Sequence, residues 1–413
     1  MASTCDQMQL QRRSTSFNDE LLQQDAQFQK YMGTYVMHSC TSSSTTRDAE
    51  APLIYISTSA ESGLSIMRRG LPPAAGADFR VPALHCSFTS SLHPHYEVVK
   101  EQCDEWILDV AQPPCAAARQ LLQDCAIPLL ICRNIPNASS NNRLVHATKM
   151  IAWLFITDDE VDHPDALGAD EVHTMHHACQ VLSILRGSPA AHAPAAHEYH
   201  VPFDISSKEK KREAALLALA ELWAEMRREM SPRLCARFVS TMEEHFDAVK
   251  VQATYRKANK RLPSVQAYKE IRRHASFILP CFVLVEYAVG IDLDEATYAN
   301  ARIQEFRIAA MDHIWLSNDL ISCKMEIGVG DYFNMPSIVY AGRGGLTLQG
   351  AVDIVADMVH DMDARCVSLL QTIFEEVILS KEATTIRTYL SSLCNCMSGS
   401  LAWHLETPRY ATT

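Results

Sequence analysis

The pattern of residues predicts an all-α protein, and three observations lead to this prediction. Apolar residues recur three or four positions apart, the spacing of a helix face, in a series of long segments. The alternation of apolar and polar residues that is typical of half-buried strands is almost absent. Glycine is scarce, with 14 residues in 413, and glycine and proline cluster between the apolar segments, where helix breakers are expected.

The helical pattern is expected to begin at residue 79 and to continue through the rest of the chain. Helices are predicted, in chain order, over 96–110, 144–156, 208–230, 253–260, 268–288, 294–327, 348–380 and 383–406. The first opens after a turn at Pro94. The segment 144–156 is apolar almost throughout, which indicates a helix buried on most sides. The segment 208–230 has leucines and Trp223 on one face and lysines and arginines on the other, so it is predicted to be amphipathic.

Residues 1–78 differ from the rest of the chain. They contain a Ser/Thr run over 39–46, a Pro72-Pro73 pair and one strand-like patch at 53–57 that has no second strand to pair with. We expect a flexible N-terminal extension over 1–78 and a folded domain over 79–413. The stretch 187–206, rich in proline and histidine, is expected to be a solvated loop, because no carboxylate or cysteine completes a metal site there.

Composition and charge exclude several classes of protein. Hydrophobic residues make up 47% of the chain and charged residues 21%, which is typical of a globular protein. The net charge of −12 and the absence of a long basic run argue against a nucleic-acid partner. The most apolar stretch, 277–291, is too short for a transmembrane segment. With no apolar signal-peptide core near residue 1, we expect a cytoplasmic protein whose 14 cysteines are mostly reduced and buried.

Two clusters of oxygen-bearing side chains are the candidates for chemistry. In the first, Asp158-Asp159-Glu160-Val161-Asp162, the aspartates at 158 and 162 share a helix face at the end of an apolar helix. Like charges at that spacing repel, so the cluster favours a bound cation, and oxygen ligands suit Mg²⁺. The alternative is a solvated helix end before the turn at Pro164.

The second cluster, in the run NDLISCKME, consists of Asn318, Asp319, Ser322 and Glu326. Asn318, Ser322 and Glu326 are spaced i, i+4 and i+8, so they form one polar stripe on a helix. An amide oxygen, a hydroxyl and a carboxylate can hold one divalent cation, weakly unless a phosphate completes the shell. A polar face toward solvent is the alternative. If the two helices face each other, several Mg²⁺ ions could bridge both clusters and a diphosphate.

These residues resemble a class I terpene synthase, in particular the fungal, basidiomycete-type sesquiterpene synthases. DDEVD at 158–162 resembles the aspartate-rich motif of that family, and NDLISCKME at 318–326 resembles its N-D-x-x-S-x-x-x-E triad. Arg272 precedes the triad at the interval usual for the diphosphate-sensing arginine, although Arg273 is a second candidate. Arg409-Tyr410 resembles the C-terminal Arg-Tyr pair of the family. Ala275 and Ser276 depart from the residues that the family often has in the helix break beside the sensor.

The resemblance covers about 79–413 and implies a single all-α domain, a helical bundle around a deep apolar pocket. It also implies a set of site residues. The metal ligands would be Asp158, Asp159, Asp162, Asn318, Ser322 and Glu326, which together would hold three Mg²⁺ ions. The diphosphate-binding residues would be Arg272, Lys324, Arg409 and Tyr410, with catalytic roles for Arg272, Arg409 and Tyr410. Aromatic pocket residues would include Phe155 and Trp315, chosen from a wider set with Trp153, Phe306 and Trp403.

The implied function is a Mg²⁺-dependent sesquiterpene cyclase, a carbon–oxygen lyase that ionises farnesyl diphosphate and cyclises the carbocation, with a weak preference for 1,11-closure through a humulyl-type cation. Alternatives are a synthase acting on geranyl or geranylgeranyl diphosphate and a non-catalytic helical binding protein. A chain-elongating prenyltransferase would carry a second aspartate-rich motif where this chain has NDLISCKME. The expected partner is a small prenyl diphosphate, and the chain is expected to be a monomer or a weak homodimer.

Overall fold

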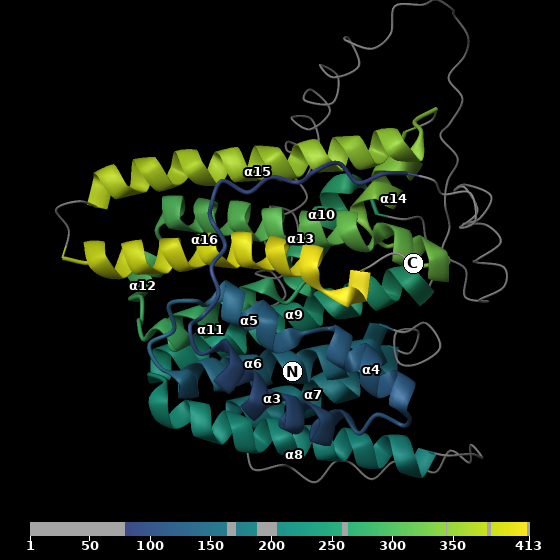
Figure 1. The fold of residues 1–413 in the computed structure, drawn as a ribbon, viewed down its shortest axis with the longest axis vertical. Coiled ribbons are helices and arrows are strands. Elements are labelled where there is room, and N and C mark those ends of the chain that lie inside the picture. The colour runs from purple at the N-terminus through teal and green to yellow at the C-terminus, as the bar shows by residue number, and fades with distance from the viewer. Residues whose placement is uncertain are drawn as a thin grey trace, which may run out of the picture.

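The computed structural model describes residues 79–162, 171–187, 205–257, 263–343, 345–377 and 381–410 (Figure 1). Within these ranges every regular element is a helix, which confirms the all-α prediction. The helices are α3 (Tyr96–Ala111), α4 (Ala116–Asp124), α5 (Ile127–Asn134), α6 (Asn141–Asp162), α7 (Glu171–Arg186), α8 (Ile205–Glu229), α9 (Pro232–Lys257), α10 (Val265–Ala275), α11 (Ile278–Val289), α12 (Glu295–Tyr298), α13 (Ala301–Val329), α14 (Met335–Ala341), α15 (Leu348–Val377), α16 (Ala383–Glu406) and the 3₁₀ turn η2 (Pro408–Tyr410).

Several predicted helix boundaries were wrong for local reasons. The segment 268–288 is two helices, α10 and α11, because Phe277 takes a left-handed backbone conformation with φ of 63°. The segment 294–327 is also two, since the Asn300 side chain accepts hydrogen bonds from the backbone N–H groups of Arg302 and Ile303 and begins α13 there. Most of α9 and the whole of α4, α5, α7 and α14 were not predicted. The helix predicted over 383–406 is α16, with the same bounds.

Residues 79–95 form an extended strap, so the helical pattern begins at Tyr96 and not at residue 79. The strap runs along α15 (Figure 1), where the Arg80 backbone N–H donates to Gln349 Oε1 at 2.8 Å and Gln349 Nε2 donates back to the Arg80 carbonyl at 3.0 Å. Farther along, the Ser87 backbone N–H donates to Asp363 of α15 at 2.8 Å. Side chains of α15 therefore satisfy backbone groups that a helix would have satisfied internally.

The long helix α13 organises the core. It packs against α10, α14, α15 and α16 and runs alongside α15 and α16 in the bundle (Figure 1). Apolar residues such as Phe306, Trp315 and Leu320 bury it on more than one side. Because α13 is central, the polar stripe that begins at Asn318 is held inside the bundle and does not form an outer face.

The predicted extension over 1–78 lies outside the described residues, as does most of the loop predicted over 187–206. No disulfide joins cysteines within the described ranges, and Cys394 and Cys396 are buried in the core, as the sequence indicated. None of the helices described has the length and apolarity needed to cross a bilayer.

Helix α16 approaches α5 at Gly399. A Cβ atom at this position would lie 2.5 Å from the backbone oxygen of Arg133 and 2.6 Å from its carbonyl carbon, both too close for any carbon contact. The two helices can meet here only because residue 399 has no side chain. This contact sets the position of α16 and of the η2 turn that follows it.

Gly399→Ala should therefore destabilise the protein by about 1–3 kcal/mol, the usual cost of overpacking a well-packed contact. Gly328→Ala on α13 is the matched control, because a Cβ there meets nothing within 4 Å. Alanine also favours a helix over glycine by up to about 1 kcal/mol, so the control should be neutral or stabilising. Urea unfolding followed by circular dichroism measures both. Equal effects of the two substitutions would contradict the close contact.

Candidate functional site

Asn318, Ser322 and Glu326 occupy successive turns of α13, as their spacing predicted. Ser322 is buried, and its Oγ donates to the backbone carbonyl of Asn318 at 2.8 Å. The hydroxyl oxygen keeps its lone pairs for another partner. The three side chains thus present an amide oxygen, a hydroxyl oxygen and a carboxylate along one line of a central helix.

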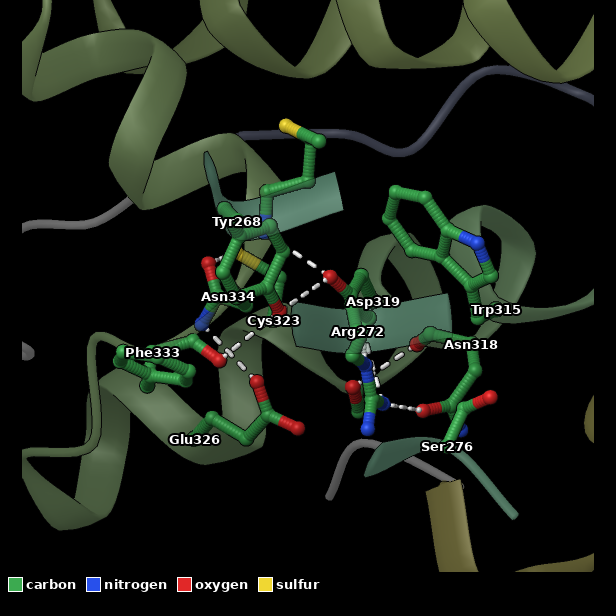
Figure 2. Close-up of polar contacts among 12 residues, drawn as sticks. Tyr268, Arg272, Ser276, Trp315, Asn318, Asp319, Cys323, Glu326, Phe333 and Asn334 are labelled. Carbon is green, nitrogen blue, oxygen red and sulfur yellow. Dashed lines mark hydrogen bonds and ion pairs between the residues drawn. The ribbon is translucent and has the colours of Figure 1, made fainter. Parts of the chain in front are cut away.

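Asp319 is the best-connected carboxylate of the site, although the sequence analysis placed it in the second cluster without a role. It is 1% exposed. Its Oδ2 lies 2.7 Å from the Tyr268 hydroxyl and accepts from the Met335 backbone N–H at 2.9 Å, while its Oδ1 accepts from Arg272 Nε at 3.0 Å (Figure 2). Burial raises the pKa of Asp319, and Arg272 opposes that shift.

The structure separates the two candidate arginines. Arg272 lies between Asn318 and Asp319 (Figure 2), and its NH2 group donates to Asn318 Oδ1 at 2.9 Å. Arg273 turns to the other side of α10 and donates to both carboxylate oxygens of the buried Asp312, at 2.8 and 2.6 Å. Arg272 is therefore the arginine beside the polar stripe, and Arg273 neutralises a different buried carboxylate.

Glu326 lies in an anionic part of the site. Its Oε2 accepts from Asn334 Nδ2 at 2.9 Å, and Asn334 Oδ1 in turn accepts from the Ser337 backbone N–H at the start of α14. Burial raises the pKa of Glu326 to about 8, and the charges of Asp331 and Asp319 add to that shift. A carboxylate in this environment is stabilised by a nearby cation.

Lys324 is not brought to this cluster. It is exposed, and its position lies about 200° around the helix from Ser322. The expected diphosphate contact of Lys324 stays a prediction that the arrangement of α13 does not favour.

The C-terminal turn η2 covers the start of the stripe. The Tyr410 hydroxyl accepts from Asn318 Nδ2 at 3.3 Å. The guanidinium of Arg409 lies 5.7 Å from the centre of the Phe155 ring on α6, and that ring meets Trp403 edge-on at 6.2 Å. Residues from α6, α13, α16 and the C-terminus, far apart in the sequence, therefore meet at one place.

His404 fixes the orientation of the Asn318 amide, and sequence analysis missed it because no motif spacing includes it. His404 Nδ1 lies 2.7 Å from the Ser400 carbonyl, which can only accept, so Nδ1 carries the proton. His404 Nε2 is then the acceptor for Asn318 Nδ2, at 2.9 Å. Burial lowers the pKa of His404 to about 4, which keeps the ring neutral and this acceptor available. The amide oxygen of Asn318 must therefore point away from His404.

The aspartate-rich cluster forms the last turn of α6, since the backbone of residues 158–162 is helical and α6 ends at Asp162. The side chains of Asp158, Asp159 and Asp162 lie outside the described part of the chain. Their place in the fold is still informative, because Phe155, less than one turn earlier, contacts Trp403 and Arg409. The residues that follow these two, His404 and Tyr410, reach Asn318. The end of α6 thus lies on the side of the bundle where the stripe begins.

The other aromatic candidates are engaged in packing. Trp315 is 1% exposed, donates from Nε1 to Asp312 at 2.9 Å and meets Tyr268 edge-on at 6.1 Å. Trp153 donates to the Ala215 carbonyl at 2.7 Å. A cavity of about 1040 Å³ lies between α3 and α4, and its lining includes Glu101, Asp104 and Arg119, so it is not the predicted apolar pocket. That pocket stays a prediction.

The donor set along α13 fits a hard divalent cation. Asn318, Ser322 and Glu326 offer only oxygen atoms, and Asp331 adds negative charge near Glu326. Arg272 beside them offers N–H donors suited to an anion. An oxygen site for a cation next to a fixed guanidinium is the arrangement expected where a metal and a phosphate share one ligand shell.

Comparison with known proteins identifies the class. The model of terpene synthase family 2, C-terminal metal binding, matches residues 149–363, more than half of the chain, and this range includes both oxygen clusters and Arg272. The chain belongs to this family of metal-binding terpene synthases.

Individual relatives agree with the family. The chain is 26% identical over 336 residues to Microbial Terpene synthase-like protein 13 of Selaginella moellendorffii, covering 81% of this chain and 87% of that protein. It is 27% identical over 352 residues to Sesquiterpene synthase Agr3 of Cyclocybe aegerita, covering 82% and 90%. The crystal structure of germacradien-4-ol synthase from Streptomyces citricolor shares the fold, with a TM-score of 0.63 at 20% identity over 78% of this chain and 97% of that one.

The orientation of Asn318 generates a prediction about metal binding. His404→Ala removes the acceptor that holds the amide, so the affinity for a divalent cation should fall about 10–100-fold, the usual effect of losing a residue that orients a metal ligand. His404→Gln can still accept from Asn318 and should recover part of the affinity. Titration of Mn²⁺ by electron paramagnetic resonance, with inorganic diphosphate present, measures it. Unchanged affinity in folded His404→Ala would refute the orienting role.

Proposed function

We propose that this chain is a Mg²⁺-dependent sesquiterpene cyclase that ionises farnesyl diphosphate, cyclises the resulting carbocation and releases diphosphate. One observation carries the proposal: the guanidinium of Arg272 and the hydroxyl of Tyr410 meet at Asn318, the first of the three oxygen-bearing residues on one face of α13. The name of the fungal relative Agr3, a sesquiterpene synthase, supports the choice of a substrate with fifteen carbons.

Each polar group of the site then has a role. Asn318, Ser322 and Glu326 would hold one Mg²⁺, and Asp158 with Asp162 and Asp159 would hold the others, three ions in all. When bound, Mg²⁺ neutralises the charge that develops on the leaving diphosphate. Arg272 and Arg409 donate N–H groups to diphosphate oxygens, and Lys324 is the weakest of the proposed donors.

The choice of Arg272 as the diphosphate sensor rests on what each arginine already binds. Arg273 is committed to both oxygens of buried Asp312, so turning it toward a substrate would leave that carboxylate with only the Trp315 N–H and the Lys269 ammonium 3.8 Å away. Arg272 contacts Asp319 through Nε and Asn318 through NH2, which leaves other N–H groups of its fork for phosphate oxygens.

The C-terminal turn would close the site and exclude water. Tyr410 reaches Asn318 with its hydroxyl, and its ring meets Trp403 edge-on at 5.7 Å. Phe155, whose ring meets Trp403 edge-on at this end of the bundle, would stabilise a cationic intermediate with its ring face. Excluding water keeps the cation from being quenched before the ring closes. Closure between carbons 1 and 11, through a humulyl-type cation, is the regiochemistry that we propose.

Incubation of the purified chain with farnesyl diphosphate and Mg²⁺ should release diphosphate and give a cyclic hydrocarbon or alcohol, identified by gas chromatography with mass spectrometry. Asn318→Ala and Asp158→Ala should each abolish turnover with little change in unfolding. Gln304→Ala, an exposed position on α13, is the control. Turnover of geranyl or geranylgeranyl diphosphate but not of farnesyl diphosphate would show that the proposed substrate is wrong. Full activity in both variants would contradict a mechanism that needs both clusters. If no prenyl diphosphate were turned over, a non-catalytic binding protein would be favoured.

The two arginines should respond differently to the same substitution. Arg272→Gln removes a donor aimed at the developing charge, and we expect turnover per folded molecule to fall about 10²–10³-fold. Because it also takes the guanidinium from buried Asp319, it should cost about 1–3 kcal/mol of stability as well. Arg273→Gln strips Asp312 of its main partner, and we expect a loss of about 1–3 kcal/mol in stability with near-normal turnover per folded molecule. Arg302→Gln, exposed at the start of α13, controls for loss of charge. The reverse pattern would assign the sensor to Arg273.

A further inference from the structure

A second cluster of metal-binding side chains lies outside the proposed active site. Cys86 of the strap, His313 of α13 and Asp363 of α15 each place one ligand atom so that all three atoms lie within 4.8 Å of one another. Ligands around a bound zinc ion are about 3.5 Å apart, so shifts of about 1 Å would complete the geometry. The cluster joins three segments that are far apart in the sequence.

His313 is the residue that calls for an explanation. It is 0% exposed, and neither ring nitrogen has a hydrogen-bond partner of regular geometry within the described ranges. The backbone of His85 lies near the ring but outside that geometry. A buried imidazole without partners costs free energy, because at least one nitrogen has lost its hydrogen bond to water. A metal ligated by one ring nitrogen would remove part of that cost.

The surroundings of the other two ligands, Asp363 and Cys86, also suit a metal ion. Asp363 is 4% exposed, and the Ser87 backbone N–H and Oγ–H both donate to it, at 2.8 and 2.5 Å. Such outer contacts hold a carboxylate in place for a metal while leaving it lone pairs. Cys86 is partly buried at the surface of the bundle, which gives an ion a path of entry. Cys366 and Cys394 lie near Cys86, so the surroundings are rich in thiols.

We propose that Cys86, His313 and Asp363 bind one Zn²⁺ ion that fastens the strap of residues 79–95 to α13 and α15. A thiolate, a carboxylate and a neutral imidazole together carry two negative charges, which balance the ion and leave a buried site with no net charge. The Cys86 thiol gives its proton to solvent on binding. The fourth position of the tetrahedron is left for water.

This site is distinct in place and chemistry from the proposed magnesium site. His313 precedes Asn318 by five residues, so it projects about 140° around α13 from the polar stripe. Thiolate and imidazole ligands favour zinc, whereas the stripe offers oxygen atoms alone. The proposal therefore stands or falls independently of the cyclase activity.

The test uses the full chain, freed of metal with a chelator, mixed with a slight excess of Zn²⁺ in millimolar Mg²⁺ and then desalted. Mass spectrometry of the metal content should find about one zinc ion per chain. Cys86→Ser and Asp363→Asn should each lose most of it, and Cys115→Ser, an exposed thiol at the start of α4, should not. Circular dichroism checks that each variant is folded.

Cobalt(II) in place of zinc identifies the ligands directly. The metal-free chain should develop the visible absorption of tetrahedral cobalt together with a thiolate-to-cobalt charge-transfer band. Cys86→Ser should lose the charge-transfer band, while Cys115→Ser keeps both features. A wild-type chain that retains no zinc and gives no tetrahedral cobalt spectrum would overturn the proposal, as would zinc retained equally by folded Cys86→Ser.

Discussion

The buried carboxylate of Asp319 is the interaction on which the candidate site depends. An ionised carboxylate removed from water costs several kcal/mol unless donors replace the water. Here the donors come from two other helices: Tyr268 and Arg272 belong to α10, and the Met335 backbone N–H lies at the start of α14. Satisfying Asp319 therefore fixes α10 and α14 against α13. It also places Arg272 beside Asn318, the residue that precedes Asp319 on α13.

Asn318 connects Arg272 to the C-terminal residues of the described chain by hydrogen bonds. Its amide oxygen accepts from Arg272, while its amide nitrogen donates to His404 and lies within reach of the Tyr410 hydroxyl. Because His404 is a neutral acceptor, the two ends of the amide cannot exchange without losing a hydrogen bond at each end. One side chain thus connects α10, the end of α16 and the η2 turn.

The sequence allowed the parts of the site that depend on helix periodicity to be predicted. The i, i+4, i+8 spacing of Asn318, Ser322 and Glu326 places them on one face of any helix, whatever surrounds it. The bounds of α16 likewise follow from local pattern. Asp319 lies in the motif and His404 outside it, but the role of neither could be predicted in this way, since each depends on partners that only the tertiary fold supplies. Lys324 lies inside the motif, yet it is exposed and does not lie on the face of α13 that carries Asn318, Ser322 and Glu326. Membership of a motif therefore does not by itself place a side chain in the site.

Two departures at the level of the fold have the same origin. The break at Phe277 was implied by the family resemblance, which has a helix break beside the sensor arginine, but helix periodicity alone predicted one helix over 268–288. The strap over 79–95 is held by Gln349 and Asp363, from a helix more than two hundred residues later. The local sequence pattern predicts neither a backbone conformation that packing enforces nor a partner so distant in the chain.

The Arg272–Asn318 hydrogen bond occupies the same amide oxygen that a bound cation would use. A divalent cation and a guanidinium repel each other, so both are not stable on the single oxygen of Asn318. With Mg²⁺ held by Asn318, Ser322 and Glu326, the NH2 group of Arg272 would give up the Asn318 oxygen, while its Nε–H could keep the hydrogen bond to Asp319. The freed N–H groups would then be available to a diphosphate oxygen. In this arrangement the buried carboxylate of Asp319 would keep Arg272 within reach of an anion, with or without its bond to Asn318.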